Sequence, residues 1–180
     1  MTHHPIFDYI DPVFLSIGPF TIYWYGISYI VGILLGYKYC IYLSQKYKIN
    51  ISSQQLDDFI LWSVIGIIIG GRLGYMIFYN LRAYLDNPLK ILKIYQGGMS
   101  FHGGLIGIIV SSIFFAMKHR IKLLNLWDLI ICASPIGFFF GRLANFINGE
   151  LVGRVTNSSM GIVFPGYSLP RHPSQLYEAF

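Results

Sequence analysis

The sequence predicts an all-α membrane protein, a polytopic bundle of transmembrane helices that forms a single integral membrane domain over residues 1–180. Hydrophobic residues make up 54% of the chain, charged residues make up only 12%, and the mean hydropathy is +0.55. Soluble globular domains carry about 25% charged residues, so this composition excludes that class. The net charge of +5 therefore bears on topology and anionic lipid more than on nucleic acid. Four apolar runs reach the roughly 20 residues that a helix needs to cross a bilayer.

The first span is predicted from Phe20 to Leu43, where tyrosine and tryptophan side chains precede a long aliphatic run. Such aromatic residues favour the interface between membrane and water. Residues 1–19 hold three prolines and two histidines among scattered apolar residues, which indicates an interfacial segment before the span. The adjacent His3 and His4 are interpreted as part of a solvated terminus rather than as a metal site.

The second span is predicted to follow a polar connector over residues 45–55 and to end near Tyr79. Asp57 and Asp58 stand near its start, where the N-terminus of a helix favours carboxylates. Small residues recur on one face of this helix, which favours close packing against another helix. These small residues are Ser63, Gly66, Gly70 and Gly74.

The third span is predicted to begin near Phe101, after a mixed and partly amphipathic loop over residues 81–96. It ends in a densely basic turn over residues 117–122. This helix also carries small residues on one face, and we expect that face to pack against a neighbouring helix. Its small residues are Gly104, Gly107 and Ser111.

The fourth span is predicted from about Leu126 to Ile147, and a polar, glycine-rich excursion outside the cytoplasm follows over residues 148–171. Pro173 then opens a fifth helix over residues 174–180, because proline is favoured in the first turn of a helix. The chain ends inside that helix. We therefore expect a C-terminally truncated domain with four full spans and the start of a fifth.

The basic residues favour an extracytoplasmic amino terminus. No lysine or arginine precedes Lys38, and the short turn after the third span is densely basic, as cytoplasmic loops are. In this topology the cytoplasmic basic residues are Lys38, Lys46, Lys48, Lys118, Arg120 and Lys122, and the extracytoplasmic ones are Arg82, Lys90, Lys93, Arg154 and Arg171. The two groups are of similar size, so the prediction depends on the first two features.

Two arginines lie inside predicted spans, Arg72 in the second and Arg142 in the fourth. An arginine at the bilayer centre costs roughly 3 kcal/mol or more, so each is expected to snorkel, to line a wet cavity or to bind an anion. In the predicted topology both lie late in outward-running helices, at a depth similar to that of His102. Two arginines at one depth favour a shared function over snorkelling.

The fourth span ends in a polar cluster. Small and amide residues share one stripe of this helix, with Arg142 one step round, which favours packing against another helix over exposure to lipid. The residues of the stripe are Gly137, Gly141, Asn145 and Asn148. Glu150 and Arg154 follow, and an ion pair of little energetic value at the rim is their simplest interpretation.

His102 lies between paired glycines in the sequence GGMSFHGG, residues 97–104, at the start of the third span. Paired glycines let the backbone approach a ligand closely, and the positive end of a helix favours the neutral imidazole, which can accept a proton. The alternative is an interfacial histidine that bonds a loop carbonyl. Arginines for a phosphate, amides for hydroxyls and a neutral base together indicate a site for an anionic phospholipid headgroup.

Three motifs of this chain resemble those of the bacterial prolipoprotein diacylglyceryl transferase family. They are GGMSFHGG at residues 97–104, GRLANFINGELVGR at residues 141–154 and RHPSQLYE at residues 171–178. Their order and spacing also match, and YWYG at residues 23–26 fits the family's first helix. The second motif is the family's signature, and Val152 stands where a tryptophan is common there. We expect no loss of chemistry from that difference.

The resemblance implies a transferase with seven spanning helices and an extracytoplasmic head, located in the bacterial inner membrane with its active site facing the outer leaflet. Such enzymes transfer the diacylglyceryl group of phosphatidylglycerol to the thiol of the lipobox cysteine in a preprolipoprotein signal peptide. A thioether forms and glycerol phosphate is released, as the first step of lipoprotein maturation. No metal, nucleotide or other cofactor is implied.

Residue roles follow from the motifs. Arg142 would bind the phosphate and stabilise the departing group, and His102 would be the candidate base for the thiol. A cysteine thiol has a pKa of about 8.5, so a base or a positive field promotes its attack. The residues that would shape the headgroup pocket are Tyr25, Arg142, Asn145, Glu150 and Gly153.

The family places a further essential arginine in a later segment, so we expect residues 1–180 alone to be inactive. Two other functional classes remain open. A lipid or solute transporter would also explain arginines within spans and glycine-lined helices, but it needs no histidine beside paired glycines. A purely structural membrane subunit predicts that alanine is tolerated at positions 102 and 142.

Overall fold

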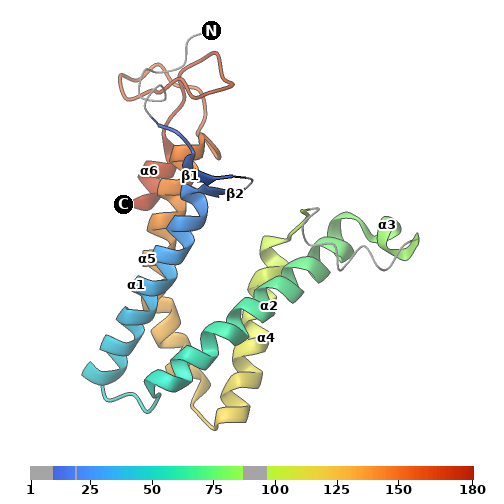
Figure 1. Ribbon diagram of the computed structural model, residues 1–180, viewed down its shortest axis with the longest axis vertical. Helices are drawn as coiled ribbons and strands as arrows, with labels where there is room; N and C mark the ends of the chain where they lie inside the picture. The colour runs from blue at the N-terminus through green and yellow to red at the C-terminus, as the bar shows by residue number, and fades with distance from the viewer. Residues whose placement is uncertain (1–9, 19, 87–96) are drawn as a thin grey trace. The chain divides into compact units, whose positions relative to one another are not determined.

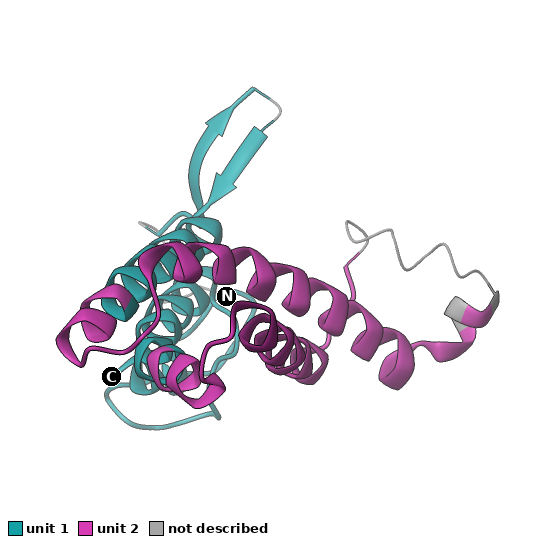
Figure 2. Ribbon diagram, turned by 90° about the horizontal axis from the view of Figure 1, so that it is seen from below, with its two compact units in different colours: residues 1–40, 130–180 teal, residues 41–129 magenta. Residues whose placement is uncertain are grey.

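The computed structural model describes residues 10–18, 20–86 and 97–180. Two compact units make up the chain (Figure 2). Unit 1 comprises Met1–Cys40 and Ile130–Phe180, and unit 2 comprises Ile41–Leu129. The expectations for His3, His4, Lys90 and Lys93 lie outside the described residues. The single domain predicted over residues 1–180 stays a prediction.

Four helices are long and apolar enough to cross a membrane (Figure 1). They are α1 (Trp24–Lys46), α2 (Ser53–Tyr79), α4 (Phe101–His119) and α5 (Leu123–Asn148). Two short helices, α3 (Leu81–Asp86) and α6 (Ser174–Ala179), complete the helical content of the described residues. The predicted polytopic helix bundle with four full spans is therefore confirmed. The helix predicted over residues 174–180 is present as α6, and its role as the start of a fifth span stays a prediction.

The first span begins at Trp24, and its predicted start at Phe20 is wrong. Phe20–Tyr23 instead forms strand β2, which pairs antiparallel with strand β1, Val13–Ile17. The Trp24 amide donates to the carbonyl of Pro12 at 3.0 Å, and the Trp24 ring meets Phe14 edge-on at 4.7 Å. Hydropathy misplaced this boundary because aromatic and β-branched residues are as apolar in a strand as in a span.

Helix α2 starts with a capping box that the sequence analysis did not identify. The Ser52 hydroxyl accepts from the Gln55 amide at 3.2 Å, and the Gln55 side chain accepts from the Ser52 amide at 2.9 Å. Both interactions satisfy amide groups that the first turn of a helix leaves without partners. This start at Ser53 lies just before the predicted Asp57 and Asp58, which are exposed.

Helices α2 and α4 pack antiparallel within unit 2, glycine against glycine. A Cβ atom built on Gly66 would lie 2.7 Å from the Gly107 carbonyl oxygen and 2.7 Å from the Ser111 hydroxyl, closer than real Cβ contacts. A Cβ on Gly74 would lie 2.7 Å from the Cα of Gly103. The backbones thus touch where side chains would otherwise separate them, which confirms a small-residue face on each helix. On α4 the close contacts involve Gly103, Gly107 and Ser111, and Gly103 was not among the predicted residues.

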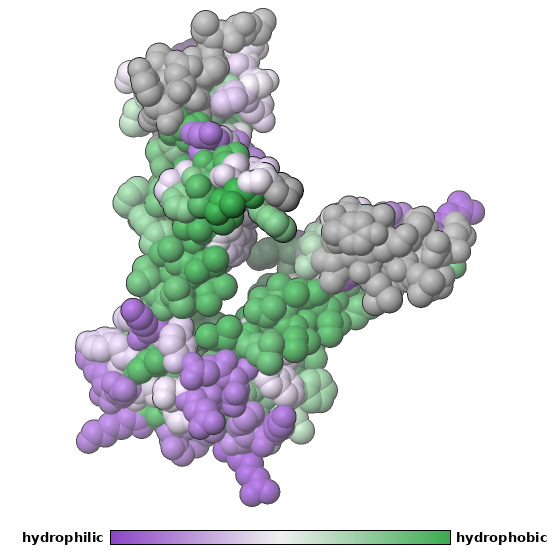
Figure 3. All heavy atoms as spheres, in the orientation of Figure 1, coloured by the Kyte–Doolittle hydropathy of each residue, from purple (hydrophilic) through white to green (hydrophobic). Residues whose placement is uncertain are grey.

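Aromatic packing and basic residues mark the other end of this helix pair. Phe115 is fully buried and packs edge-on against Phe59 and Trp62, with ring centroids 5.2 and 5.9 Å apart. The ammonium group of Lys118 lies 5.2 Å from the centre of the Trp62 ring. Figure 3 shows hydrophilic residues gathered at this end of unit 2, where α2 begins and α4 ends. Unit 2 therefore has one polar, basic end and a long apolar surface.

The excursion over residues 148–171 folds back onto the end of α5 in unit 1. Phe146 of α5 and Phe164 form a small buried core, with ring centroids 5.9 Å apart. Isolated bridges pair Arg171 with Val155 and Ile162, so the start and end of the excursion lie side by side. The residues packed around this core are Ile10, Val152, Ile162 and Leu176. The apolar core holds the polar loop close to the end of the span.

Candidate functional site

The chain turns sharply where α5 ends. Gly149 adopts a φ of +67° and Leu151 a φ of +52°, both in the left-handed region that favours glycine. The Glu150 amide donates to the Asn145 carbonyl at 2.9 Å, which caps the end of the helix. Asn145 is buried, whereas Glu150 is exposed. The turn therefore presents the Glu150 side chain directly beyond the last turn of the span.

Side chains at the start of α6 donate hydrogen bonds to the backbone of this turn, residues 149–151, which we call the clasped turn. The Gln175 amide nitrogen donates to the Glu150 carbonyl at 2.5 Å, and the Ser174 hydroxyl donates to the Leu151 carbonyl at 3.0 Å. Gln175 is fully buried. The sequence analysis matched the RHPSQLYE motif but assigned no role to these two residues. In the sequence, Ser174 and Gln175 are simply two polar residues at the start of a short helix. Local sequence alone cannot show that they bond to a turn more than 20 residues earlier.

Gly153 lies against the backbone of His172. Its amide donates to the His172 carbonyl at 2.9 Å, and its own carbonyl accepts from the Arg171 guanidinium at 2.9 Å. A Cβ on Gly153 would lie 2.7 Å from the His172 carbonyl oxygen. Only glycine fits this approach, so the residue has a packing reason that is independent of any ligand. Its predicted place in a headgroup pocket stays a prediction.

Arg142 is paired with a carboxylate of its own unit. Its Nη2 atom forms an ion pair with Oε2 of Glu178 on α6, and its side chain is 29% exposed. Asn145, one turn further along α5, shares the same side of the helix and is buried. The arginine thus meets an anion instead of only snorkelling. A guanidinium and a buried amide at the end of an apolar helix are chemically suited to a phosphate and a hydroxyl.

Tyr25 also belongs to unit 1, in the first turn of α1. Its hydroxyl lies 3.2 Å from the Tyr29 hydroxyl, and the two rings are 5.1 Å apart. The side chain is partly buried, and its hydroxyl already has this partner one turn along the helix. Tyr25, Arg142, Asn145, Glu150 and Gly153 are therefore all in unit 1.

Three residues around the clasped turn have buried polar atoms without a hydrogen-bond partner among the described residues. These atoms are Asn148 Oδ1, Arg171 Nε and Gln175 Oε1. Buried polar groups are nearly always paired, with protein or with water, because leaving one unpaired costs about 1–3 kcal/mol. The head of unit 1 therefore has an interior whose hydrogen-bonding groups are not all paired by the described residues.

Arg72 and His102 flank one loop of unit 2, residues 97–100. The Arg72 guanidinium is buried and donates to the carbonyls of Gly97 and Gly98, the latter at 2.9 Å. The Ser100 amide donates to the Gly71 carbonyl at 2.9 Å, so helix α2 holds this loop at two points. The structure thus gives Arg72 a role in holding the loop. That role explains the buried charge without a phosphate.

His102 is the second residue of α4, and its side chain is exposed. Among the described residues, the His102 ring contacts the Phe101 ring edge-on, with ring centroids 5.7 Å apart. Just before it, the Ser100 hydroxyl accepts from the Gly103 amide at 3.2 Å and caps the helix. His102 and Arg142 belong to different units, so their predicted convergence at one depth stays a prediction.

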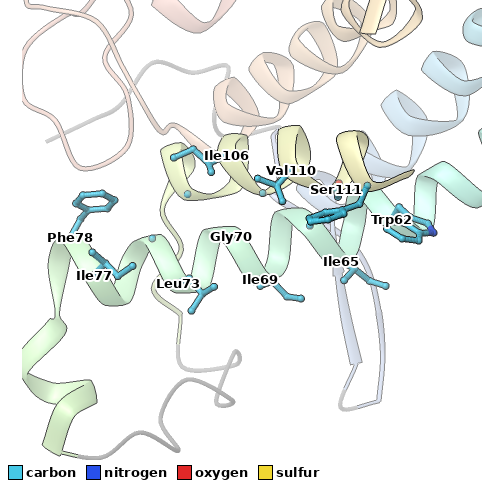
Figure 4. Close-up of a pocket in the computed structure, with 15 residues that line it drawn as sticks. Trp62, Ile65, Ile69, Gly70, Leu73, Ile77, Phe78, Ile106, Val110 and Ser111 are labelled. Atoms are coloured by element: carbon cyan, nitrogen blue, oxygen red, sulfur yellow. The ribbon is translucent and has the colours of Figure 1, made fainter. Parts of the chain in front are cut away.

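An apolar groove of about 630 Å³ runs along α2 and α4 within unit 2. Figure 4 shows Ile65, Ile69, Leu73 and Ile77 along α2 and Val110 on α4, and all five line the groove. Gly66, Gly70, Gly103 and Gly107 also line it, so the close glycine contact forms part of the groove. None of the predicted site residues lies in this groove. The polar residues that could bind a headgroup therefore do not line the apolar groove. We place the candidate site at those polar residues.

Replacing Arg72 by methionine is expected to loosen the 97–100 loop. Two carbonyls would lose a charged donor, and such hydrogen bonds are each worth about 1.5–3 kcal/mol. Hydrogen–deuterium exchange of the purified protein in detergent should show faster exchange in residues 97–104. Arg82→Met is the matched control, because Arg82 is exposed on α3. Unchanged exchange in Arg72→Met would contradict the role assigned to Arg72.

Comparison with known proteins identifies the family. The family model described as prolipoprotein diacylglyceryl transferase matches residues 12–180. A phosphatidylglycerol–prolipoprotein diacylglyceryl transferase of Rickettsia canadensis is 57% identical over 176 residues, which cover 97% of this chain and 68% of the relative. The enzyme of the same name from Rickettsia typhi is 57% identical over 172 residues, covering 95% and 66%. That from Rickettsia bellii is 53% identical over 175 residues, covering 97% and 66%.

These relatives match the chain almost from end to end, and the chain spans about two thirds of their length. The matched range contains the end of α5, the clasped turn and the loop before α4, so it includes every residue of the candidate site. The chain belongs to the prolipoprotein diacylglyceryl transferase family.

Proposed function

We infer that this chain transfers the diacylglyceryl group of phosphatidylglycerol to the thiol of the lipobox cysteine of a preprolipoprotein. The names of its Rickettsia relatives support the donor and the acceptor class. The observation that carries the inference is the placement of Arg142. This residue lies near the end of an apolar helix beside the buried Asn145, in a head whose interior retains polar atoms without a partner among the described residues. An anionic headgroup at a membrane surface fits this arrangement.

The reaction forms one bond and breaks one. The cysteine sulfur attacks the glycerol carbon that carries the phosphate ester, a carbon–sulfur bond forms, and the carbon–oxygen bond to phosphate breaks. Glycerol phosphate leaves with the electron pair, and Arg142 stabilises its growing negative charge. The thiol proton passes to His102, whose exposed imidazole is the candidate base. No redox step is involved.

Four other residues would shape the headgroup pocket. Tyr25 and Asn145 offer a hydroxyl and an amide for the glycerol hydroxyls, and the exposed Glu150 carboxylate can accept hydrogen bonds from them. Gly153 would contribute because it has no side chain, so the backbone at this position can lie close to that of His172 at the edge of the pocket. These roles follow the family motif, and the clasp of α6 on the turn supports them.

We propose that the chain lies in the bacterial inner membrane with its amino terminus outside the cytoplasm. In unit 2, basic residues gather where α2 begins and α4 ends, and cytoplasmic ends are enriched in such residues. They are Lys46, Lys48, Lys118, Arg120 and Lys122. The loop before His102 then lies on the opposite, outer side. The excursion over residues 148–171 would be extracytoplasmic, and the site would face the outer leaflet.

The test uses the protein as its gene encodes it, in membranes with labelled phosphatidylglycerol and a lipobox peptide. Wild type is expected to form a thioether product and release glycerol phosphate. His102→Ala is expected to lower the rate about 10²- to 10⁴-fold, the usual contribution of general base catalysis. His119→Ala is the matched control, because His119 stacks on Phe115 at the opposite end of α4.

Three results would contradict the proposal. Movement of labelled lipid between leaflets without a covalent product would favour a transporter. Equal rates for wild type and His102→Ala, measured at several pH values, would show that His102 is not the base. A structural subunit would show no product in any variant under conditions that support a Rickettsia enzyme.

A further inference from the structure

We propose that Glu178 is a positioning residue for Arg142, a carboxylate that aims the guanidinium at the phosphate of the lipid. This inference rests on the proposed function of Arg142. The sequence analysis gave Glu178 no role. In the structure its Oε2 atom forms an ion pair with Nη2 of Arg142, and the two side chains are 49% and 29% exposed. The pair joins α6 to the last turns of α5 within unit 1.

Arg142 needs such a partner to stay at the site. Its side chain is long and flexible and extends from an apolar helix. Without a nearby anion the favourable course is to snorkel towards water. A carboxylate at a fixed point removes that freedom and holds one edge of the planar guanidinium. Orientation matters here because arginine binds phosphate through two parallel N–H groups, which must face the ligand.

Glu178 can provide a fixed point because the start of α6 is held by hydrogen bonds and by apolar packing. At its start, the buried Gln175 donates to the Glu150 carbonyl and Ser174 donates to the Leu151 carbonyl. Next to Gln175, Leu176 packs against the buried core that Phe146 of α5 forms with Phe164. The carboxylate is therefore carried by a helix that is fastened near the end of α5.

The ion pair leaves donors for a ligand. A guanidinium has five N–H groups, and Glu178 engages a single nitrogen. Within the described residues, the structure shows Arg142 no further protein partner. The remaining N–H groups can therefore meet a phosphodiester while Glu178 stays in place. This arrangement differs from that of Arg72, whose guanidinium serves the loop carbonyls of Gly97 and Gly98.

Two other interpretations of the pair make different predictions. If Glu178 only ties α6 to α5, its loss should lower stability and leave the binding of phosphatidylglycerol unchanged. If Glu178 competes with the phosphate as a counter-ion, its loss should tighten binding. Positioning alone predicts weaker binding in a protein that remains folded.

The experiment compares wild type, Glu178→Gln and Glu178→Asp in the protein as its gene encodes it. Binding of spin-labelled phosphatidylglycerol is measured in detergent, and kcat and KM are measured with a lipobox peptide. Glu178→Gln keeps the shape of the side chain and removes its charge. The affinity of this variant for phosphatidylglycerol is expected to fall roughly tenfold or more, because the charge-assisted contact with Arg142 is lost. Glu178→Asp keeps the charge and is expected to recover part of the loss. Asp57→Asn removes an exposed carboxylate of α2 and should match wild type.

Thermal unfolding separates positioning from a structural tie. Glu178→Gln should unfold within a few degrees of wild type while its KM rises. Affinity equal to wild type in Glu178→Gln, or tighter, would overturn the proposal. If wild type binds the lipid but forms no thioether, the proposed function fails, and the binding comparison still decides the role of Glu178.

Discussion

Arg142→Ala is expected to abolish thioether formation, with a rate at least about 10³-fold below that of wild type. Loss of a single preorganised donor to a developing anion costs about 10²- to 10³-fold in rate. Arg142 also carries the positive charge that we assign to the phosphate. The measurement is the yield of thioether-linked peptide with labelled phosphatidylglycerol, together with the release of glycerol phosphate.

The matched variant for this test is Arg142→Lys. Lysine keeps the charge but lacks the planar fork that binds phosphate through two hydrogen bonds, so partial activity is expected. Because Arg142→Ala leaves Glu178 without its partner, Arg142→Ala with Glu178→Gln checks that the loss does not come from an unpaired carboxylate. Product formation by either alanine variant at the wild-type rate would refute the role of Arg142.

Gly107→Ala is expected to separate α2 from α4 and to deprive the protein of a stable fold in detergent. A Cβ atom at this position would overlap the Gly66 carbonyl oxygen, which is backbone and cannot rotate away. Overpacking that shifts backbone costs typically 1–3 kcal/mol and sometimes more, and the close glycine contact extends along both helices. The measurement is the midpoint of thermal unfolding, with the yield of monodisperse protein beside it.

Gly137→Ala is the matched control, also a helical glycine within a span. Among the described residues, no heavy atom outside the neighbouring backbone of its own helix lies within 4 Å of a Cβ built there, so the new methyl group meets open space. Alanine favours the helix over glycine by about 1 kcal/mol, and the midpoint should stay level or rise. If both variants unfolded at the same temperature, the packing assigned to Gly107 would be wrong.

The candidate site was predictable where its chemistry is local in the chain. Arg142, Asn145 and Glu150 stand within one short stretch, and a charge near the end of an apolar helix is unusual enough to indicate a function. The family motif supplied their roles, which remain proposals. Arg72 shows the limit of that reasoning. As a second arginine in a span it seemed equivalent to Arg142, yet its guanidinium is occupied by the loop before α4.

By itself, the sequence determined the four spans and the small-residue faces of α2 and α4. Both depend on hydropathy, length and helical period, which are properties of contiguous residues. The tertiary structure alone decided the strand pairing before Trp24, the clasp of Gln175 on the Glu150 turn and the ion pair of Arg142 with Glu178. The last two contacts join segments separated along the chain, whereas the strand pairing joins neighbouring residues that are as apolar as those of a span. Which polar group reaches which partner is therefore set by the packing of helices and turns, which no local pattern records.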